Sequence, residues 1–246
     1  MISKVFLDIY NAVWKEVFPD ITPLPIDTFK TIFTKDLLLP VQKECIVKKT
    51  PIYIGKEYTY KRFISDEARW ERINVDNNMS PKIPVSSLAD IVPKVQEFAF
   101  FKGSRTQNSD VVEESDDIHS SSYIYNSEHI YNSSKILFGY NIQQSEFLLA
   151  SSGNKACEFG IALVDSASTS NSFDIGWSAK SSNCYFCNNV FDLRDCMFCF
   201  NIESKQYCIA NMQFTEEEYK KLKPMILKEY IDQLQKPDGF RFVSDL

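Results

Sequence analysis

This chain is poor in residues on which several protein classes depend. It has two His, His119 and His129, which leaves little material for His-centred catalysis or for mixed Cys/His metal sites. No stretch approaches the roughly 18 consecutive apolar residues of a membrane span. Asp8 and Lys15 interrupt the apolar residues at the N-terminus, which does not resemble a signal peptide. We therefore expect no membrane contact, no secretion, and a location in the cytoplasm or within a virus particle.

Basic charge and glycine are scarce as well. The formal net charge of −6 argues against broad binding to nucleic acid, which needs a basic surface. The 246 residues include 7 Gly, so repeated turns must be made by Asn, Ser and Asp. Gly-rich phosphate loops, HExxH and GxSxG motifs are absent from the sequence. These absences favour a protein that is not an enzyme and that binds another protein or a second copy of itself.

Residues 1–102 predict a helical region that also contains a β-hairpin. Apolar residues at helical spacing over residues 1–18 predict one amphipathic helix. Asp27 is placed to act as the N-cap of a second helix. A weaker helix is predicted from about Ser86, and we expect Pro93 to interrupt it.

Two short runs of β-forming residues flank Gly55-Lys56. They are Ile52-Tyr53-Ile54 and Tyr58-Thr59-Tyr60, and they predict a hairpin that turns at the glycine. Residues 103–118 are polar and carry 5 acidic side chains close together. We interpret this stretch as an exposed acidic loop or linker, since such charge is usually solvated.

The most informative feature is a period of twelve residues in the second half of the chain. Five cysteines share it, one set twelve residues apart and a second set offset by three residues: Cys184, Cys196, Cys208, Cys187 and Cys199. A regular period indicates one structural unit stacked many times, and this unit is too short for a helical hairpin. Short apolar patches between Asn and Ser suit short strands joined by turns. The pattern predicts a parallel β-solenoid over residues 119–214.

The repeat extends toward the N-terminus, where serine replaces cysteine. Ser121 and Ser127 are six residues apart, and Ser145 and Cys157 begin two copies of one motif, SEFLLA and CEFGIA. Ser172 follows Cys157 by fifteen residues, which predicts a slip of three residues in the register. The sequence leaves open whether one coil of the solenoid takes one twelve-residue unit or two.

Residues 215–246 predict a cap for this stack. Thr215 followed by Glu218 is a capping box, so a helix should begin there, and Pro224 should kink or restart it. A solenoid exposes sheet edges at its ends, and a terminal helix can close one of them. The chain is therefore predicted to be mixed α+β, with a helical and hairpin N-terminal region, a parallel β-solenoid and a C-terminal capping helix.

Cys184, Cys187, Cys196 and Cys199 admit more than one interpretation. Two CxxC pairs separated by eight residues have the spacing of a four-thiolate zinc site. The same cysteines also belong to the repeat, which Cys208 extends where no ligand is needed. We favour a ladder of free thiols inside the solenoid, with zinc as the alternative and ladder disulfides third. No other cofactor is predicted.

The closing repeats resemble a known family. Residues 198–219 read FCFNIESKQYCIANMQFTEEEY. This run is similar to the ending FGC-x-N-L-x-x-K-x-YCI-x-N-x-Q-Y-[ST]-x-EEY of an uncharacterised family of Cys-rich repeat proteins, encoded mainly in genomes of candidate-phyla bacteria. The likeness is strongest over residues 184–235, and it implies a β-solenoid-like stack without implying an activity. This chain has fewer cysteines than the family and lacks its N-terminal zinc-finger-like cysteines.

Three functions are open for such a chain. We favour a non-enzymatic structural or protein-interaction protein, a rigid scaffold within a larger assembly such as a phage or virus particle. The second is a zinc-binding module built on the four cysteines. The third is a carbohydrate-active β-helix enzyme, since such enzymes place paired carboxylates along an outer groove. Its candidate carboxylates are Asp165, Asp174, Asp192 and Asp195.

Overall fold

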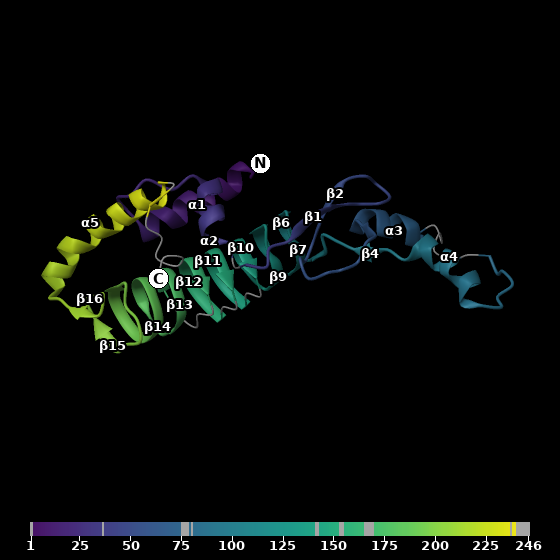
Figure 1. Cartoon of the computed structure of the whole chain (residues 1–246). Coiled ribbons are helices and arrows are strands. Elements are labelled where there is room, and N and C mark those ends of the chain that lie inside the picture. The colour runs from purple at the N-terminus through teal and green to yellow at the C-terminus, as the bar shows by residue number, and fades with distance from the viewer. Residues whose placement is uncertain are drawn as a thin grey trace.

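The computed structural model of the protein describes residues 2–35, 37–74, 79, 81–140, 143–152, 155–164, 170–236 and 238–239. It describes the backbone alone for residues 73–74, 143–152, 155–164, 170–171 and 173–177. A long solenoid forms the body of the molecule (Figure 1). Helices cover one of its sides, and an arm projects beyond its first coils (Figure 1). The predicted fold class is confirmed.

The helices are α1 (Lys4–Val17), α2 (Ile26–Phe33), α3 (Asp66–Asn74), α4 (Leu88–Phe98) and α5 (Glu216–Leu234). The amphipathic helix predicted over residues 1–18 is thus present as α1. Helix α2 begins one residue before Asp27, which lies in its first turn, and Pro25 occupies the cap position. Ser87 and Asp90 form a capping box on α4, and Pro93 lies inside α4 without ending it.

The N-terminal hairpin is real, but its predicted position is wrong. Strand β1 (Val41–Glu44) pairs antiparallel with β2 (Pro51–Ile54), and residues 58–60 form no strand. Gly55 makes no hairpin turn. It serves a close approach, because a side chain there would collide with the carboxylate of Glu128. Strands β3 (Phe63–Ile64) and β4 (Phe101–Lys102) pair in parallel, so they bring the two ends of the arm together.

The solenoid strands follow one another in a single sheet: β5 (Thr106–Gln107), β6 (Asp110–Glu113), β7 (Asp116–His119), β8 (Ser122–Tyr125), β9 (Glu128–Tyr131), β10 (Ser134–Tyr140), β11 (Gln143–Ser152), β12 (Lys155–Val164), β13 (Ser170–Ala179), β14 (Ser182–Met197), β15 (Glu203–Gln206), β16 (Cys208–Ile209) and β17 (Met212–Gln213). The predicted linker at 103–118 is therefore wrong, since β5, β6 and β7 belong to the sheet. The acidic residues concealed this pattern, because the buried Ser115 lies among them and the buried Ile118, three residues later, directly follows them.

One coil takes twelve residues along the whole solenoid. Parallel pairing joins Ser134 to Glu146, Glu146 to Glu158, Glu158 to Ser170 and Ser170 to Ser182, each a step of twelve. The predicted slip before Ser172 is wrong, because Gly160 pairs with Ser172 in the same step. A sequence spacing of fifteen residues is one coil plus one further side of three residues.

A left-handed residue at every third position makes the corners of each coil. From Val111 to Phe138, and again from Lys180 to Ala210, every third residue has a φ between 47° and 64°. Twelve residues in steps of three give four corners per coil. Asn and Asp tolerate this conformation, whereas for other residues it costs about 1 kcal/mol or more. Phe186 and Phe198 adopt it and stack on each other from coil to coil, with ring centroids 4.9 Å apart.

From Ser115 to Ile136 and from Ser181 to Cys199, the residue after each corner is buried inside the solenoid, so the interior there consists of four columns of side chains. In the first coils two of these columns are aliphatic: Ile124 with Ile136, and Ile118 with Ile130. The other two columns are serine. The Ser121 hydroxyl donates to the His119 carbonyl at 2.7 Å and accepts from the Ser133 N–H at 3.1 Å. Serine therefore satisfies backbone groups within a coil and between coils.

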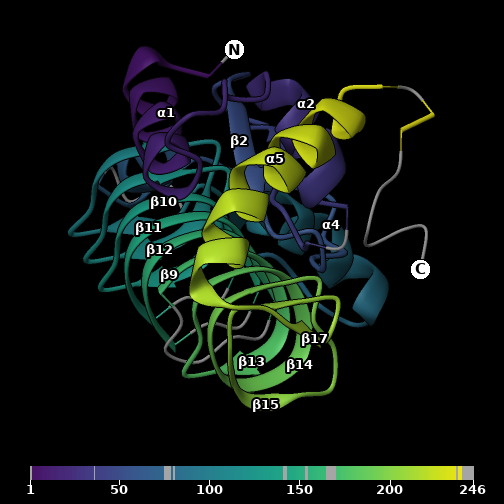
Figure 2. The ribbon, with the colours of Figure 1, turned by 90° about the vertical axis from the view of Figure 1, so that its left-hand side faces the viewer.

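Helices α1, α2 and α5 cover one outer side of the solenoid, where Figure 2 shows them together. Trp14 of α1 is buried there. The Tyr230 ring of α5 meets Phe186 edge-on at 4.3 Å. Helix α5 begins at Thr215 with the predicted capping box, continues past Pro224, and returns along the flank of the last coils (Figure 1). At the end of the stack, β17 pairs antiparallel with β16 and so covers its edge.

Candidate functional site

The four cysteines of the sequence hypothesis meet inside the solenoid. Cys184 and Cys187 lie on neighbouring sides of one coil, and Cys196 and Cys199 occupy the same columns one coil later. At most 1% of any of these residues is exposed. The four sulfurs are neighbours around a ring, and each thiol donates to the backbone carbonyl two residues earlier, that of Ser182, Tyr185, Arg194 or Met197. All four are free thiols, as in the predicted ladder.

Interactions among these neighbouring thiols split their acidities. They lower the pKa of Cys184 and Cys199 and raise the pKa of Cys187 and Cys196. The reason is that neighbouring thiols that keep their protons stabilise a negative charge on the sulfur between them. Burial opposes charge on every member of the ring.

The cysteines also replace serine in its backbone role. The Cys199 thiol donates to the Met197 carbonyl two residues earlier at 3.2 Å. The Ser127 hydroxyl, in the same column six coils before, donates to the Tyr125 carbonyl at 2.8 Å. Thiol and hydroxyl thus make equivalent bonds, which accounts for the alternation of Ser and Cys in the sequence.

A tetrahedral zinc site requires a tighter cluster of sulfurs. Zn–S bonds near 2.3 Å place all four sulfurs about 3.8 Å apart. Among the described residues, one group of three His, Cys, Asp or Glu side chains has all its ligand atoms within 4.8 Å of one another, and this group contains no cysteine. Zinc binding would therefore require the sulfurs on opposite sides of the cysteine ring to move closer together. The zinc hypothesis stays a prediction.

The carboxylates suggested for a carbohydrate-active site have a structural role where the structure describes them. Asp165 and the side chain of Asp174 lie outside the described part. Asp192 and Asp195 are left-handed corner residues. Asp192 accepts from Ser204 at 3.2 Å, twelve residues away, and Asp195 bonds in the same way within the solenoid surface. These bonds join neighbouring coils, as expected of corner residues.

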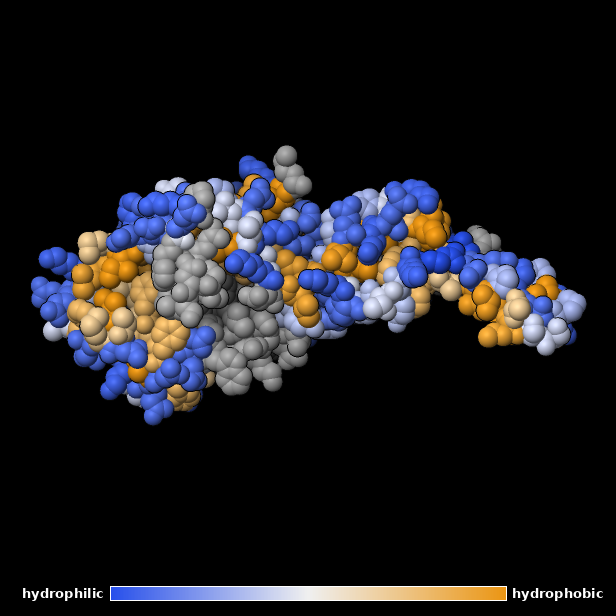
Figure 3. Space-filling view, in the orientation of Figure 1, coloured by the Kyte–Doolittle hydropathy of each residue, from blue (hydrophilic) through white to orange (hydrophobic). Residues whose placement is uncertain are grey.

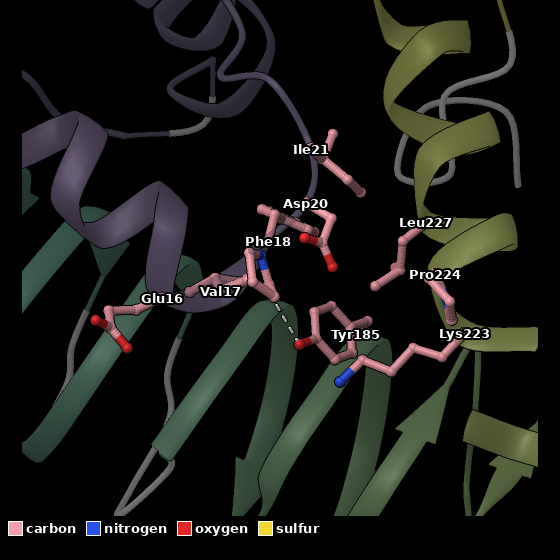
Figure 4. A pocket seen from close by; sticks show the side chains of 10 residues that line it. Glu16, Val17, Phe18, Asp20, Ile21, Tyr185, Lys223, Pro224 and Leu227 are labelled. Atoms are coloured by element: carbon pink, nitrogen blue, oxygen red, sulfur yellow. Dashed lines mark hydrogen bonds between the residues drawn. The ribbon is translucent and has the colours of Figure 1, made fainter. Parts of the chain in front are cut away.

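A cavity of about 270 Å³ lies between α1, α5 and the solenoid (Figure 4). Its centre is Tyr185, whose hydroxyl donates to the Val17 carbonyl at 3.1 Å. The Lys223 ammonium lies 4.5 Å from the Tyr185 ring, and burial lowers the pKa of Lys223. The hydrogen bond from Tyr185 holds α1 against the solenoid, so we interpret the cavity as a packing gap between α1, α5 and the coils.

The arm carries an uncovered apolar surface, which we call the α4 face. It consists of Leu88, Ile91, Val92 and Val95, at the spacing of one helical side and between 40% and 73% exposed. No residue of α4 is buried. Figure 3 shows hydrophobic residues at the outer end of the arm. Sequence reasoning had indicated this helix only weakly, because of Pro93.

A second group was missed altogether at the level of sequence. Glu57, Glu128 and His129 form the three-residue group with ligand atoms within 4.8 Å. Glu57 lies in the loop after β2, whereas Glu128 and His129 are adjacent in β9, so no local motif joins them. The one signal in the sequence was Glu128, a carboxylate that directly follows the inward-pointing Ser127 and is therefore buried next to it.

Among the helices that the structure describes, none combines the length and the hydropathy needed to cross a membrane. Models of known protein families, curated proteins and solved structures contain no match to this chain.

Proposed function

We propose that the chain is a non-enzymatic scaffold protein in which the solenoid holds an interaction arm in a fixed position. The observation that carries this proposal is the α4 face. Three helices cover the apolar outer side of the solenoid, whereas the apolar residues of α4 stand uncovered on the projecting arm. Uncovered apolar patches of this kind mark protein-interaction sites.

The occupant that fits the α4 face is a protein with an apolar helix or groove. Leu88 is the most exposed of the four residues, at 73%, and it begins the helix. The charged residues of α4 are Asp90, Lys94 and Glu97, and Lys94 pairs with Glu97 at 2.8 Å. This near-neutral helix does not suit a polyanion, so the apolar side provides the affinity.

A double substitution tests the proposal. Leu88→Ser with Val92→Ser removes most of the α4 face and leaves the Ser87–Asp90 capping box intact. Met225→Ser on α5 is the matched control, because Met225 is 60% exposed and lies off the arm. In a cross-linked extract of its source, the native protein should appear in one defined complex. The double variant should lose that complex, and M225S should keep it.

Two results would contradict this function. A native protein that stays a monomer without a specific partner removes its basis, and a double variant that keeps the complex rules out the α4 face. Analytical ultracentrifugation of the purified chain separates a foreign partner from a second copy. If the pure protein forms a dimer that the double variant cannot form, the occupant is a second copy.

For the larger assembly we propose a phage or virus particle. The support is compositional, since the chain is rich in Lys, Asn, Ile and Tyr. A rigid rod with an adhesive arm also suits a component that bridges neighbouring subunits. Mass spectrometry of purified particles from the source should detect the chain in a fixed ratio to the major shell protein. Its absence from the particles would exclude this setting.

The alternative is a zinc-binding module at the four cysteines, favoured by the two CxxC pairs that lie buried in neighbouring coils. It requires close to one equivalent of zinc in the native protein, lost when Cys184 and Cys199 are replaced by serine. Less than about half an equivalent would exclude it. Ser172 precedes Cys184 in one column and Ser127 lies in the column of Cys199, so the coils should accept serine at both positions.

A further inference from the structure

Glu57, Glu128 and His129 face one another where the arm meets the solenoid. The Nε2 atom of His129 lies 3.2 Å from Oε1 of Glu57 and 3.5 Å from Oε1 of Glu128. Metal bonds of 2.0–2.2 Å to nitrogen and oxygen place the ligand atoms of a tetrahedral site about 3.3–3.6 Å apart. The three side chains thus have the spacing of metal ligands, which the cysteine sulfurs lack.

The buried carboxylate of Glu128 requires a compensating positive charge beside it. Its side chain is 0% exposed, and neither carboxylate oxygen hydrogen bonds to a described residue. Burial and the nearby Glu57 raise the pKa of Glu128 to about 7. A buried carboxylate without donors is costly unless a proton or a cation compensates it. Gly55 makes room for this carboxylate, because any side chain there would collide with it.

His129 is held in the orientation of a metal ligand. Its Nδ1 atom lies 2.6 Å from Oδ2 of Asp117, and the Tyr131 hydroxyl donates to the same oxygen at 2.9 Å. A carboxylate bonded to one ring nitrogen fixes the tautomer and directs the other nitrogen at the metal. In this group the other nitrogen, Nε2, faces both glutamates.

The group is also accessible from outside. The Glu57 side chain is 40% exposed and that of His129 is 25% exposed, while Glu128 forms the buried floor. A cation can therefore enter from the side of Glu57 and keep water as a further ligand. One imidazole with two carboxylates suits Zn²⁺ and Mn²⁺, whose preferences cover these donors.

We propose that Glu57, Glu128 and His129 bind one divalent first-row transition-metal cation, of the class of Zn²⁺ and Mn²⁺. Asp117 acts as a positioning residue for His129. Since Glu57 and His129 are 72 residues apart, the cation fastens the loop after β2 to the solenoid. Its role is structural, because it fixes the base of the arm against the first coils.

Manganese is the suitable probe, because carboxylates accept it and thiolates favour softer metals. The full-length protein, freed of metal with a chelator, is titrated with MnCl₂ while free Mn²⁺ is followed by electron paramagnetic resonance. We expect one bound Mn²⁺ per chain and nitrogen coupling from one imidazole in pulsed spectra. Glu128→Gln and His129→Gln should each weaken binding at least tenfold, and Asp117→Asn should weaken it about 10- to 100-fold.

Two controls separate this site from other sources of affinity. Glu113→Gln makes the same charge change on β6 outside the group, and Cys184→Ser with Cys199→Ser alters the cysteine ring. Both should leave Mn²⁺ affinity unchanged. The thermal midpoint of the native protein should rise with Mn²⁺, and that of H129Q should not.

Several results would overturn the proposal. One is the absence of stoichiometric Mn²⁺ binding at millimolar concentration, in which case a proton on His129 bridges the two carboxylates instead. Another is equal affinity in the native protein, E128Q and H129Q. If circular dichroism shows that E128Q does not fold, Glu57→Gln decides, because Glu57 is half exposed and its replacement leaves the interior intact.

Discussion

Replacing Ser127 by alanine tests whether the serine columns hold the solenoid together. Ser127 is 0% exposed, its hydroxyl donates to the Tyr125 carbonyl at 2.8 Å, and it accepts from the Gly139 N–H at 2.9 Å. Ser127→Ala removes one atom and leaves the buried Gly139 N–H without an acceptor. Leaving a buried group unsatisfied costs about 1–3 kcal/mol. We expect a loss of about 2 kcal/mol in the free energy of unfolding, out of the roughly 5–15 kcal/mol typical of a domain.

Urea unfolding followed by far-ultraviolet circular dichroism measures this loss. Ser122→Ala is the control, because Ser122 is half-buried and does not point into a column. Ser127→Cys should cost less than the alanine variant, since Cys199 makes the equivalent carbonyl bond in the same column. Hydrogen exchange provides a local readout, in which the Gly139 amide should lose protection in Ser127→Ala.

The reasoning fails if Ser127→Ala and Ser122→Ala unfold at the same urea concentration. It also fails if the Gly139 amide remains as protected as in the native protein. Either result would mean that the aliphatic columns alone stabilise the coils.

Three further substitutions test other parts of the structure. Arg105→Met removes the guanidinium that lies 2.8 Å from the fully buried Asp116 carboxylate, and it should lower the free energy of unfolding in urea by about 3–5 kcal/mol. Adding Asp116→Asn should reduce this loss, whereas no loss in Arg105→Met would contradict a buried ion pair. Tyr185→Phe removes the hydrogen bond to the Val17 carbonyl and should lower the free energy of unfolding by about 1 kcal/mol. Amide hydrogen exchange at the end of α1 should become faster, and unchanged exchange would mean that α1 is held by apolar packing alone. Ile130→Ala opens a cavity in an aliphatic column and should lower the free energy of unfolding, measured by thermal denaturation, by about 2–5 kcal/mol. A loss below about 1 kcal/mol would mean that the coils close around the cavity.

The period of the solenoid was readable because its signal is local and repeated. Cys184, Cys196 and Cys208 stand twelve residues apart because each occupies the same column of successive coils. The capping box at Thr215 and Glu218 was equally readable, since both partners lie within four residues of sequence. Such features depend on neighbouring residues, and a single sequence contains all of their information.

The first coils were missed because charge concealed their pattern. Asp116 looked like part of a solvated acidic loop, yet it is buried and paired with Arg105. The inward positions hold only every third residue, so Ser115 and Ile118 are a sparse signal among acidic neighbours. Whether a charged stretch is a linker or a coil depends on partners elsewhere in the chain, which local composition does not contain.

The sequence by itself determined the twelve-residue repeat, its recurring cysteine and serine positions and the start of the last helix. Tertiary structure alone decided that the cysteines form a ring of thiols, that α5 lies along the flank of the coils, and that the apolar side of α4 stays uncovered. It also brought Glu57 to Glu128 and His129. The physical reason is that a ladder repeats within short stretches of chain, whereas a site is made by segments that meet only after the coils have stacked.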